Sequence, residues 1–236
     1  MIMNIDRRRT YYLMIDTETA NTKTEVCDVD RNNALVYDIG FAIIDKYGNI
    51  YRKFSYIVKD VFFDMQVMNS AYYKNKIPQY VKDIEEGTRI VTTYYEVRKI
   101  IADLLEEYEV KAVIAHNALF DYCATNATER YLTKSKYRYF FPYGTVFYDT
   151  LKMANDVICT QKTYINWCAE NGYVTKHKNP RPKATAEILY RYIKRNEEFV
   201  ESHTALEDVL IEAEIFAHCM RQHKKMRKEL FQNVEK

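Results

Sequence analysis

The stretch from which the fold can be worked out is YYLMIDTE, residues 11–18. Its first five residues form a continuous apolar run, which is typical of a central strand buried on both faces. Asp16 and Glu18 follow at once. Because side chains two apart on a strand point to the same side, both carboxylates leave the sheet on one face. The stretch therefore predicts a buried strand that ends in a pair of acids.

Two interpretations of this acid pair are open. Charged groups at the end of an apolar strand need a compensating partner, and a divalent cation is one. The alternative is that the two acids are solvated residues at the point where the strand emerges. The Asp-x-Glu pattern does not decide between them, because residues 83–85 repeat it. The apolar strand in front of Asp16 favours a functional site, since such sites lie at strand ends.

The remaining pattern predicts an α/β domain. Strands expected at 35–44 and 50–58, joined by a turn at 46–49, form an antiparallel meander with the first strand. Residues 59–95, which Pro78 interrupts, are expected to hold short helices. Further helices are expected at 96–108, from about 118, from a cap at Asp149 or Thr150, in a separate segment that ends near Gly172, at 184–196 and at 205–225. Further strands are expected at 111–115 and 145–148. This order predicts a mixed five-stranded sheet with helices on both faces.

Length and composition set limits on the class of protein. The 236 residues suit one domain, 1–236, with a core at about 11–220 and a basic helical tail at 221–236. The net charge of +2 does not indicate a type of partner. Five scattered cysteines without a C-x-x-C pair are typical of reduced thiols. Neither a secretory signal nor a membrane-length apolar stretch is found, so we expect a cytoplasmic protein without a membrane partner.

A third acid stands in HNALFD, residues 116–121. The expected strand before it delivers His116 to the sheet edge, and Asn117 is a suitable N-cap for the helix that follows. Asp121 then lies in the first helical turn, over the same sheet edge as Asp16 if the two strands are neighbours. The alternative is an ordinary capped helix, since an acid in the first turn is favoured by the helix dipole.

A fourth acid stands in ESHTALED, residues 201–208. Thr204 and Glu207 have the spacing of a capping box with Thr204 as the N-cap. His203 and Asp208 then occupy the two positions at which many helices carry a touching apolar pair. The sequence therefore predicts that His203 and Asp208 lie near one another at the start of a helix whose apolar face docks on the core.

Four carboxylates and a histidine suit metal-dependent cleavage of phosphodiesters. Two divalent cations about 3.5–4 Å apart can hold both the attacking and the leaving oxygen, and hard cations prefer carboxylate ligands. A histidine with a pKa near neutrality can take a proton from the attacking water. The spacing of five between a histidine and an acid occurs twice, at His116–Asp121 and His203–Asp208, so the placement at helix starts is better evidence than the spacing.

The three stretches resemble, in the right order, the three exonuclease motifs of the DEDD superfamily. The matching residues are 16–19 (DTET), 116–121 and 203–208. The histidine five residues before the last acid is similar to that of the DEDDh, or DnaQ-like, branch, and the resemblance covers about 11–220. It implies a ribonuclease H-like fold and a 3′→5′ exonuclease that releases nucleoside monophosphates from single-stranded 3′ ends. We expect DNA in preference to RNA.

The resemblance also implies roles for single residues. The ligands of two Mg²⁺ or Mn²⁺ ions would be Asp16, Glu18, Asp121 and Asp208, with Asp16 shared between the ions, and His203 would be the general base. The expected substrate-binding residues are Thr17, Thr19, His116 and Asn117. The sequence departs from the family in two places. No glycine follows Glu18 within residues 19–21, and residues 59–95 differ from the shortest members.

Several alternatives stay open. The basic stretch 176–183 fits either a phosphate-contacting loop or a solvated connector. Leu230-Phe231 faintly resembles a sliding-clamp peptide but lacks the expected upstream glutamine, so a polymerase or clamp partner is unsupported. The competing functions are an RNA-trimming exoribonuclease, a ribonuclease H-like endonuclease, which has no need of His203, a catalytically silent nucleic-acid-binding module and a scaffold protein.

Overall fold

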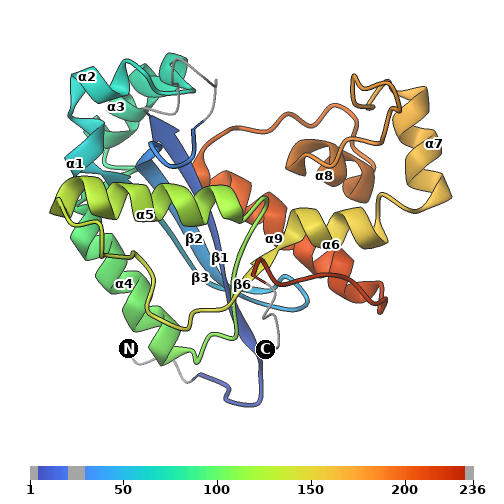
Figure 1. The fold of residues 1–236 in the computed structure, drawn as a ribbon, viewed down its shortest axis with the longest axis horizontal. Helices are drawn as coiled ribbons and strands as arrows, with labels where there is room; N and C mark the ends of the chain where they lie inside the picture. Colours follow the sequence, from blue (N-terminus) through green and yellow to red (C-terminus); the bar gives the residue numbers. More distant parts are fainter. Residues whose placement is uncertain (1–4, 21–29, 232–236) are drawn as a thin grey trace.

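A six-stranded mixed sheet with the strand order β4-β3-β2-β1-β5-β6 forms the centre of the molecule (Figure 1). The computed structural model describes residues 5–20 and 30–231. The strands are β1 (Tyr11–Ala20), β2 (Leu35–Asp45), β3 (Ile50–Val58), β4 (Ile90–Thr92), β5 (Val113–Ala115) and β6 (Phe147–Asp149). The first three form an antiparallel meander, and β5 runs parallel to β1, so the end of β5 lies at the same sheet edge as the end of β1.

The alternation of side chains along β1 divides the core into two layers. Leu13 and Ile15 face the layer that contains α4 and α5, whereas Tyr12 and Met14 face the layer that contains α6, α8 and α9. The same alternation places Asp16 and Glu18 on the α9 side. The helical elements are α1 (Lys59–Phe62), α2 (Met65–Met68), the 3₁₀ helix η1 (Lys74–Lys76), α3 (Ile77–Glu85), α4 (Tyr94–Glu107), α5 (Leu119–Thr133), α6 (Thr150–Val157), α7 (Lys162–Glu170), α8 (Ala186–Lys194) and α9 (Ala205–Arg221).

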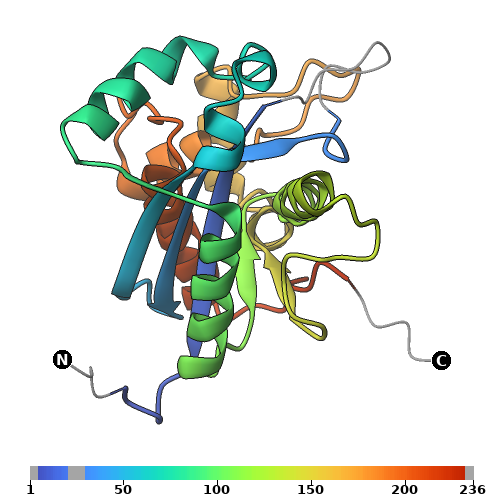
Figure 2. The ribbon, with the colours of Figure 1, turned by 90° about the vertical axis from the view of Figure 1, so that its left-hand side faces the viewer.

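The prediction of five strands is wrong, because it lacks β4. This strand has only three residues and pairs in parallel with β3 at the edge of the sheet. Figure 2 shows α4, in green, lying along β1, in dark blue, on one face of the sheet. The equally short strands β5 and β6 are fully buried, whereas β4 is exposed or half-buried, so no buried apolar run indicates it. Pro78 also does not interrupt the chain as expected. It lies in the first turn of α3, where no intrahelical partner is needed for its missing N–H, so it begins a helix.

The prediction of a helical tail is wrong for the described part of residues 221–236. The helix α9 ends at Arg221, and the chain then returns along β6 without helical structure. The Asp149 N–H donates to the Lys228 carbonyl at 2.8 Å, and the Leu230 N–H donates to the Phe147 carbonyl at 2.8 Å. Because Leu230 is buried in the core, it is not exposed as a linear clamp-binding peptide would require.

Within residues 5–20 and 30–231, none of the helices has the length and apolar character needed to cross a membrane. Part of the polar stretch that follows β1, residues 21–29, lies outside the described residues, so the departure from the family at Asn21 has no structural account.

Candidate active site

A cleft of about 700 Å³ lies at the sheet edge where β1 and β5 end. It is lined by parts of β1, by the junctions that lead into η1 and α5, by the segment between α7 and α8, and by the start of α9. The cleft brings together all five residues that the sequence predicted as catalytic, namely Asp16, Glu18, Asp121, His203 and Asp208. Four of these residues come from β1, α5 and α9, and His203 lies just before α9. Because they are spread over residues 16–208, the fold alone makes them neighbours.

Three of the acids form a close group. Oxygen atoms of Asp16, Glu18 and Asp208 all lie within 4.8 Å of one another. Burial, followed by the charge of Glu212, raises the pKa of Asp16 well above its usual value, and burial together with the charge of Glu201 raises the pKa of Asp208 to about 8. The Oδ1 atom of Asp208 is buried and has no hydrogen-bond partner among the described residues. The nearby charge of Lys76 lowers the pKa of Asp208 but does not outweigh burial and the neighbouring acids. An oxygen-lined group with this excess of negative charge fits a divalent cation.

Asp121 lies beside this group and not within it. It stands in the first turn of α5, as predicted, and burial raises its pKa to about 7. Its Oδ1 accepts a hydrogen bond of 2.8 Å from the Thr17 hydroxyl, which points to the α5 side of β1. The negative charge of Asp121 nevertheless reaches Asp16 and raises its pKa. Thr17, predicted as a substrate-binding residue, therefore uses its hydroxyl proton to hold this acid, and Thr19 is buried beside it.

The predicted N-cap of α5 is wrong. Ala118 is the N-cap, and Asn117 precedes it with a φ of 65°. Asparagine adopts this left-handed conformation more readily than most residues, which lets the chain turn sharply from β5 into α5. The Asn117 N–H donates to Oδ1 of Asp149 at 3.1 Å, and its carbonyl accepts from the Phe120 N–H at 2.8 Å. Asn117 thus fixes the approach to α5 through its backbone.

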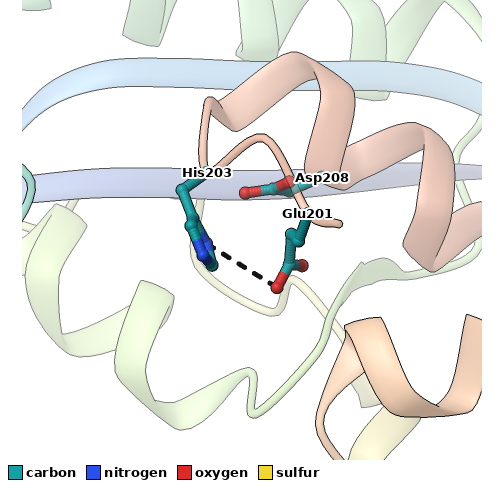
Figure 3. A group of neighbouring side chains, drawn as sticks. All are labelled: Glu201, His203 and Asp208. Carbon is teal, nitrogen blue, oxygen red and sulfur yellow. Dashed lines mark ion pairs between the residues drawn. The ribbon is translucent and has the colours of Figure 1, made fainter. Parts of the chain in front are cut away.

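His203 lies next to Asp208, as the sequence predicted. Its ring stacks on Tyr73, with 4.4 Å between ring centroids and 13° between planes. Its Nδ1 atom lies 3.6 Å from a carboxylate oxygen of Glu201, and Figure 3 shows both side chains beside Asp208. Burial and the nearby charge of Lys76 lower the pKa of His203. The ring is therefore unprotonated at neutral pH and able to accept a proton.

The sequence did not predict two further acids of the site, Glu201 and Glu212. Glu201 shares a group within 4.8 Å with His203 and Asp208, and burial together with Glu187 raises its pKa to about 7. Glu212 is buried one turn after Asp208 on α9, and its Oε2 accepts a 3.2 Å hydrogen bond from the His116 N–H. The i, i+4 spacing from Asp208 is the signal that could have identified Glu212, because such residues share a helix face.

His116 is held on both sides of its ring. Nδ1 lies 2.9 Å from the Thr150 hydroxyl, and Nε2 lies 2.7 Å from the Ala184 carbonyl. A carbonyl can only accept, so Nε2 carries the proton. Burial lowers the pKa of this histidine. The ring therefore joins the end of β5 to α6 and to the segment before α8, while its edge lines the cleft.

The start of α9 is fixed by β2, which the sequence did not reveal. Thr204 is the N-cap, as predicted, but its hydroxyl pairs with the Glu207 side chain and not with a backbone N–H. The Ala205 N–H donates instead to Oδ2 of Asp38 at 3.2 Å. Gly40 lies against the same turn, where a Cβ atom would come within 2.4 Å of the Ala205 carbonyl carbon. A buried acid and a glycine in β2 thus position the turn that carries His203 and Asp208.

The basic stretch 176–183 lies in a hairpin-like segment at the rim of the cleft. Val174 and Pro182 form an isolated antiparallel bridge, and the Lys183 N–H donates to the Tyr173 carbonyl at 2.9 Å. Arg181 and Lys183 line the cleft. Contact between this segment and phosphates stays a prediction, but its position is compatible with such contact.

Comparisons with known proteins place this geometry on a familiar fold. No protein-family model and no curated protein matches the sequence. Among solved structures, the nuclease domain of 3′hExo, a DEDDh family member, superposes with a TM-score of 0.59 at 12% identity over 94% of this chain and 98% of that chain.

Two other solved structures also superpose on most of this chain. ExoI of E. coli gives a TM-score of 0.58 at 15% identity over 91% of this chain and 40% of that chain. Pop2p of S. pombe gives 0.51 at 14% identity over 92% and 84%. The protein therefore has the ribonuclease H-like fold of the DEDDh 3′-5′ exonucleases.

Proposed function

We propose that the protein is a 3′→5′ exonuclease that releases nucleoside monophosphates from single-stranded nucleic acid, using two Mg²⁺ or Mn²⁺ ions. One observation carries the proposal: the oxygen atoms of Asp16, Glu18 and Asp208 lie within 4.8 Å of one another, directly beside His203, on the fold of these exonucleases. A nucleic-acid-binding module without activity has no need of this arrangement.

The acids would hold the ions. Asp16 and Glu18 from β1 and Asp208 from α9 supply the close oxygen ligands, and Asp121 completes the set from the α5 side. Asp16 lies near four other acids, Glu18, Asp121, Asp208 and Glu212, and is proposed as the shared ligand. When bound, the ions supply a nucleophilic water at neutral pH and stabilise the negative charge of the phosphodiester in the transition state.

His203 would accept the proton of the attacking water. The water oxygen forms a bond to the terminal phosphorus while the bond from phosphorus to the 3′ oxygen breaks, so the products are a nucleoside 5′-monophosphate and a strand shortened by one. The stack on Tyr73 and the neighbouring Glu201 restrict the orientation of the ring. The Glu201 carboxylate would also stabilise the imidazolium that forms.

The cleft suits one terminal nucleotide. Tyr72, Tyr73 and Phe120 offer ring surfaces for a base, and Arg181 and Lys183 offer positive charge for the phosphates at its rim. ExoI of E. coli was solved with single-stranded DNA and the 3′hExo nuclease domain with rAMP. For this protein we propose DNA as the preferred substrate and RNA trimming as the alternative.

The test uses purified protein and 5′-labelled single-stranded DNA and RNA of the same sequence, with Mg²⁺, Mn²⁺ or EDTA. A ladder that shortens stepwise from the 3′ end, only with a metal ion, is expected, and Asp16→Asn is the control for a contaminating nuclease. Faster degradation of RNA than of DNA would indicate that the protein is an exoribonuclease. Cuts in a circular single strand would indicate an endonuclease, and binding without cleavage would indicate a catalytically silent binding module.

A further inference from the structure

The loop between α5 and β6, residues 134–146, carries charge that the proposed exonuclease site does not use. Residues 130–148 include no Asp or Glu, but they include Arg130, Lys134, Lys136 and Arg138. Within the described part of the chain, the last three of these form no ion pair with an acid. Over the described residues, the loop therefore carries a positive charge that no ion pair offsets.

Tyrosine rings stand between these cations. Tyr137 is 79% exposed, Tyr139 is 54% exposed and Tyr143 is fully exposed. The Lys136 ammonium lies 5.1 Å from the centroid of the Tyr137 ring. Neighbouring aromatic rings and cations in a loop can stack unpaired bases and neutralise the phosphates between them.

The loop is held in place at its centre. The Phe140 N–H donates to Oδ1 of Asn126 at 2.9 Å, and its carbonyl accepts from Nε of Arg98 at 3.0 Å. The Phe140 ring packs against Tyr94, with 4.9 Å between ring centroids. Burial of Phe140 anchors the loop, so the tyrosines on either side are presented outward at a small entropic cost on binding.

We propose that this loop is a second binding surface, separate from the cleft, for single-stranded nucleic acid. The proposal rests on the proposed function only for the identity of the strand, which would be the one whose 3′ end enters the cleft. The unpaired charge favours a polyanion over a neutral protein surface, and the ring surfaces favour unpaired bases over duplex.

The geometry of α5 sets the reach of such a strand. Asp121 lies near the start of this helix and Lys134 is its C-cap residue. In Figure 1 the loop leaves the end of α5 opposite to Asp121 and returns to β6. Thirteen residues at about 1.5 Å each give about 20 Å, which a stacked strand covers with about six nucleotides at ~3.4 Å each. A shorter strand that ends at Asp121 cannot reach Lys134 along this helix.

The experiment measures binding in EDTA, by fluorescence anisotropy of single strands of about four and about twenty nucleotides, chosen to fall on either side of the expected reach. The loop variant is Lys134→Ala/Lys136→Ala/Arg138→Ala. The matched control, Lys162→Ala/Lys224→Ala/Lys225→Ala, removes three exposed charges elsewhere. Because hydrolysis is not measured, failure of the proposed exonuclease function would not affect the result.

We expect the loop variant to bind the long strand at least tenfold more weakly than the control variant. The slope of log affinity against log salt should fall by about 2, since each lost phosphate contact in a single strand contributes about 0.7. Tyr137→Ala/Tyr139→Ala should weaken binding by roughly tenfold with an unchanged slope, because stacking is lost and charge is kept. Binding of the short strand should not change.

Equal losses in the loop and control variants would overturn the proposal, as would a long strand that binds unchanged. Vesicles of phosphatidylcholine and phosphatidylserine serve as a competing target. If the loop variant loses vesicle binding but keeps oligonucleotide binding, the loop is a membrane contact and the proposal is wrong.

Discussion

Asp208 belongs to two groups of close side chains, one with Asp16 and Glu18 and the other with Glu201 and His203. A single carboxylate thus links the acids proposed to bind metal to the proposed base. The proposed metal ligands and the proposed base differ in their surroundings. Asp16 is surrounded by acids and needs positive charge, whereas His203 has a carboxylate at Nδ1 and a ring beneath it. Substitution of a metal ligand and substitution of the base should therefore have different effects on metal binding and on the rate.

For Asp16→Asn we expect loss of metal binding together with nearly all turnover, because the variant removes the charge of the shared ligand. For His203→Ala we expect the rate to fall by ~10²–10⁴-fold while the affinity for Mn²⁺ stays near that of the wild type. Higher pH should partly restore the His203→Ala rate, since hydroxide replaces the missing base. Calorimetry and single-turnover kinetics measure both effects, and loss of Mn²⁺ binding in His203→Ala would contradict the assignment.

His116→Ala should have a different effect from either variant. The ring donates to the Ala184 carbonyl and contacts Thr150, so its loss should lower the melting temperature, with roughly 1 kcal/mol for each broken hydrogen bond. The rate per folded molecule should fall less than in His203→Ala. If His116→Ala is the slower of the two with metal binding intact, the base has been assigned to the wrong one of two identically spaced histidines.

Among the elements, the contact between β2 and α9 positions the turn that carries His203 and Asp208. Gly40→Ala places a Cβ atom against the Ala205 backbone and should push the start of α9 away from β1. Overpacking of this kind costs about 1–3 kcal/mol, and the shift should also lower kcat per folded molecule by more than tenfold.

The matched control for this variant is Gly87→Ala. Gly87 has a φ of 71°, and a Cβ atom added there would meet no atom within 4 Å, so alanine should cost about 1–2 kcal/mol through backbone strain without any change in kcat. Thermal unfolding and steady-state kinetics on both variants separate the two effects. Equal kcat values for the two alanine variants would show that the contact between β2 and α9 does not position the site.

The sequence predicts buried apolar elements well and exposed or irregular ones poorly. The strands β2 and β3 and the start of α9 agree with prediction, whereas β1 continues five residues past its apolar run to Ala20, so that Asp16 and Glu18 lie within the strand and not after it. The three-residue strand β4 and the non-helical return after Arg221 have no local pattern, since tertiary contacts decide them. For Asn117 the sequence predicts the side-chain role of an N-cap, but the structure uses its tolerance of positive φ.

The same distinction applies to the candidate site. The sequence placed Asp16, Glu18, Asp121, His203 and Asp208 in one region, because strand ends and helix starts of neighbouring elements meet at one sheet edge. Other contributors depend on contacts between distant elements: Tyr73 stacks on His203, and Asp38 caps α9 from β2. A buried aspartate in an otherwise apolar strand, as in YDIG at residues 37–40, is the one local signal of such a role.

At the scale of the whole molecule, the buried acids should make stability depend on pH and metal together. Burial raises the pKa of Asp121 to about 7 and that of Asp208 to about 8, from an ordinary value of 3.8. Between about pH 4 and pH 8 the folded state therefore binds more protons than the unfolded state. The free energy of unfolding must fall as the pH rises through this range. A bound cation compensates the charge and should oppose the loss.

In EDTA we expect the melting temperature to decrease from pH 5 toward pH 8. Added Mn²⁺ should raise it, by more at pH 8 than at pH 5.5, because the ligands must be ionised to bind. Asp208→Asn should flatten the pH dependence and reduce the effect of Mn²⁺. A rise in melting temperature with Mn²⁺ that is equal at both pH values would contradict a carboxylate metal site.

The placement of the cleft at a sheet edge also bears on substrate choice. Only one strand end needs to reach His203 and the acids, and the cleft of about 700 Å³ suits a single terminal nucleotide. A paired 3′ end would have to be unstacked and separated first, at a cost of a few kcal/mol. We therefore expect a single strand or a frayed end to be degraded at least tenfold faster than a blunt duplex of the same sequence. Mismatches at the terminal pairs should restore the rate progressively, because they remove that cost. A fully paired blunt duplex degraded as fast as the single strand would mean that the cleft does not select for unpaired ends.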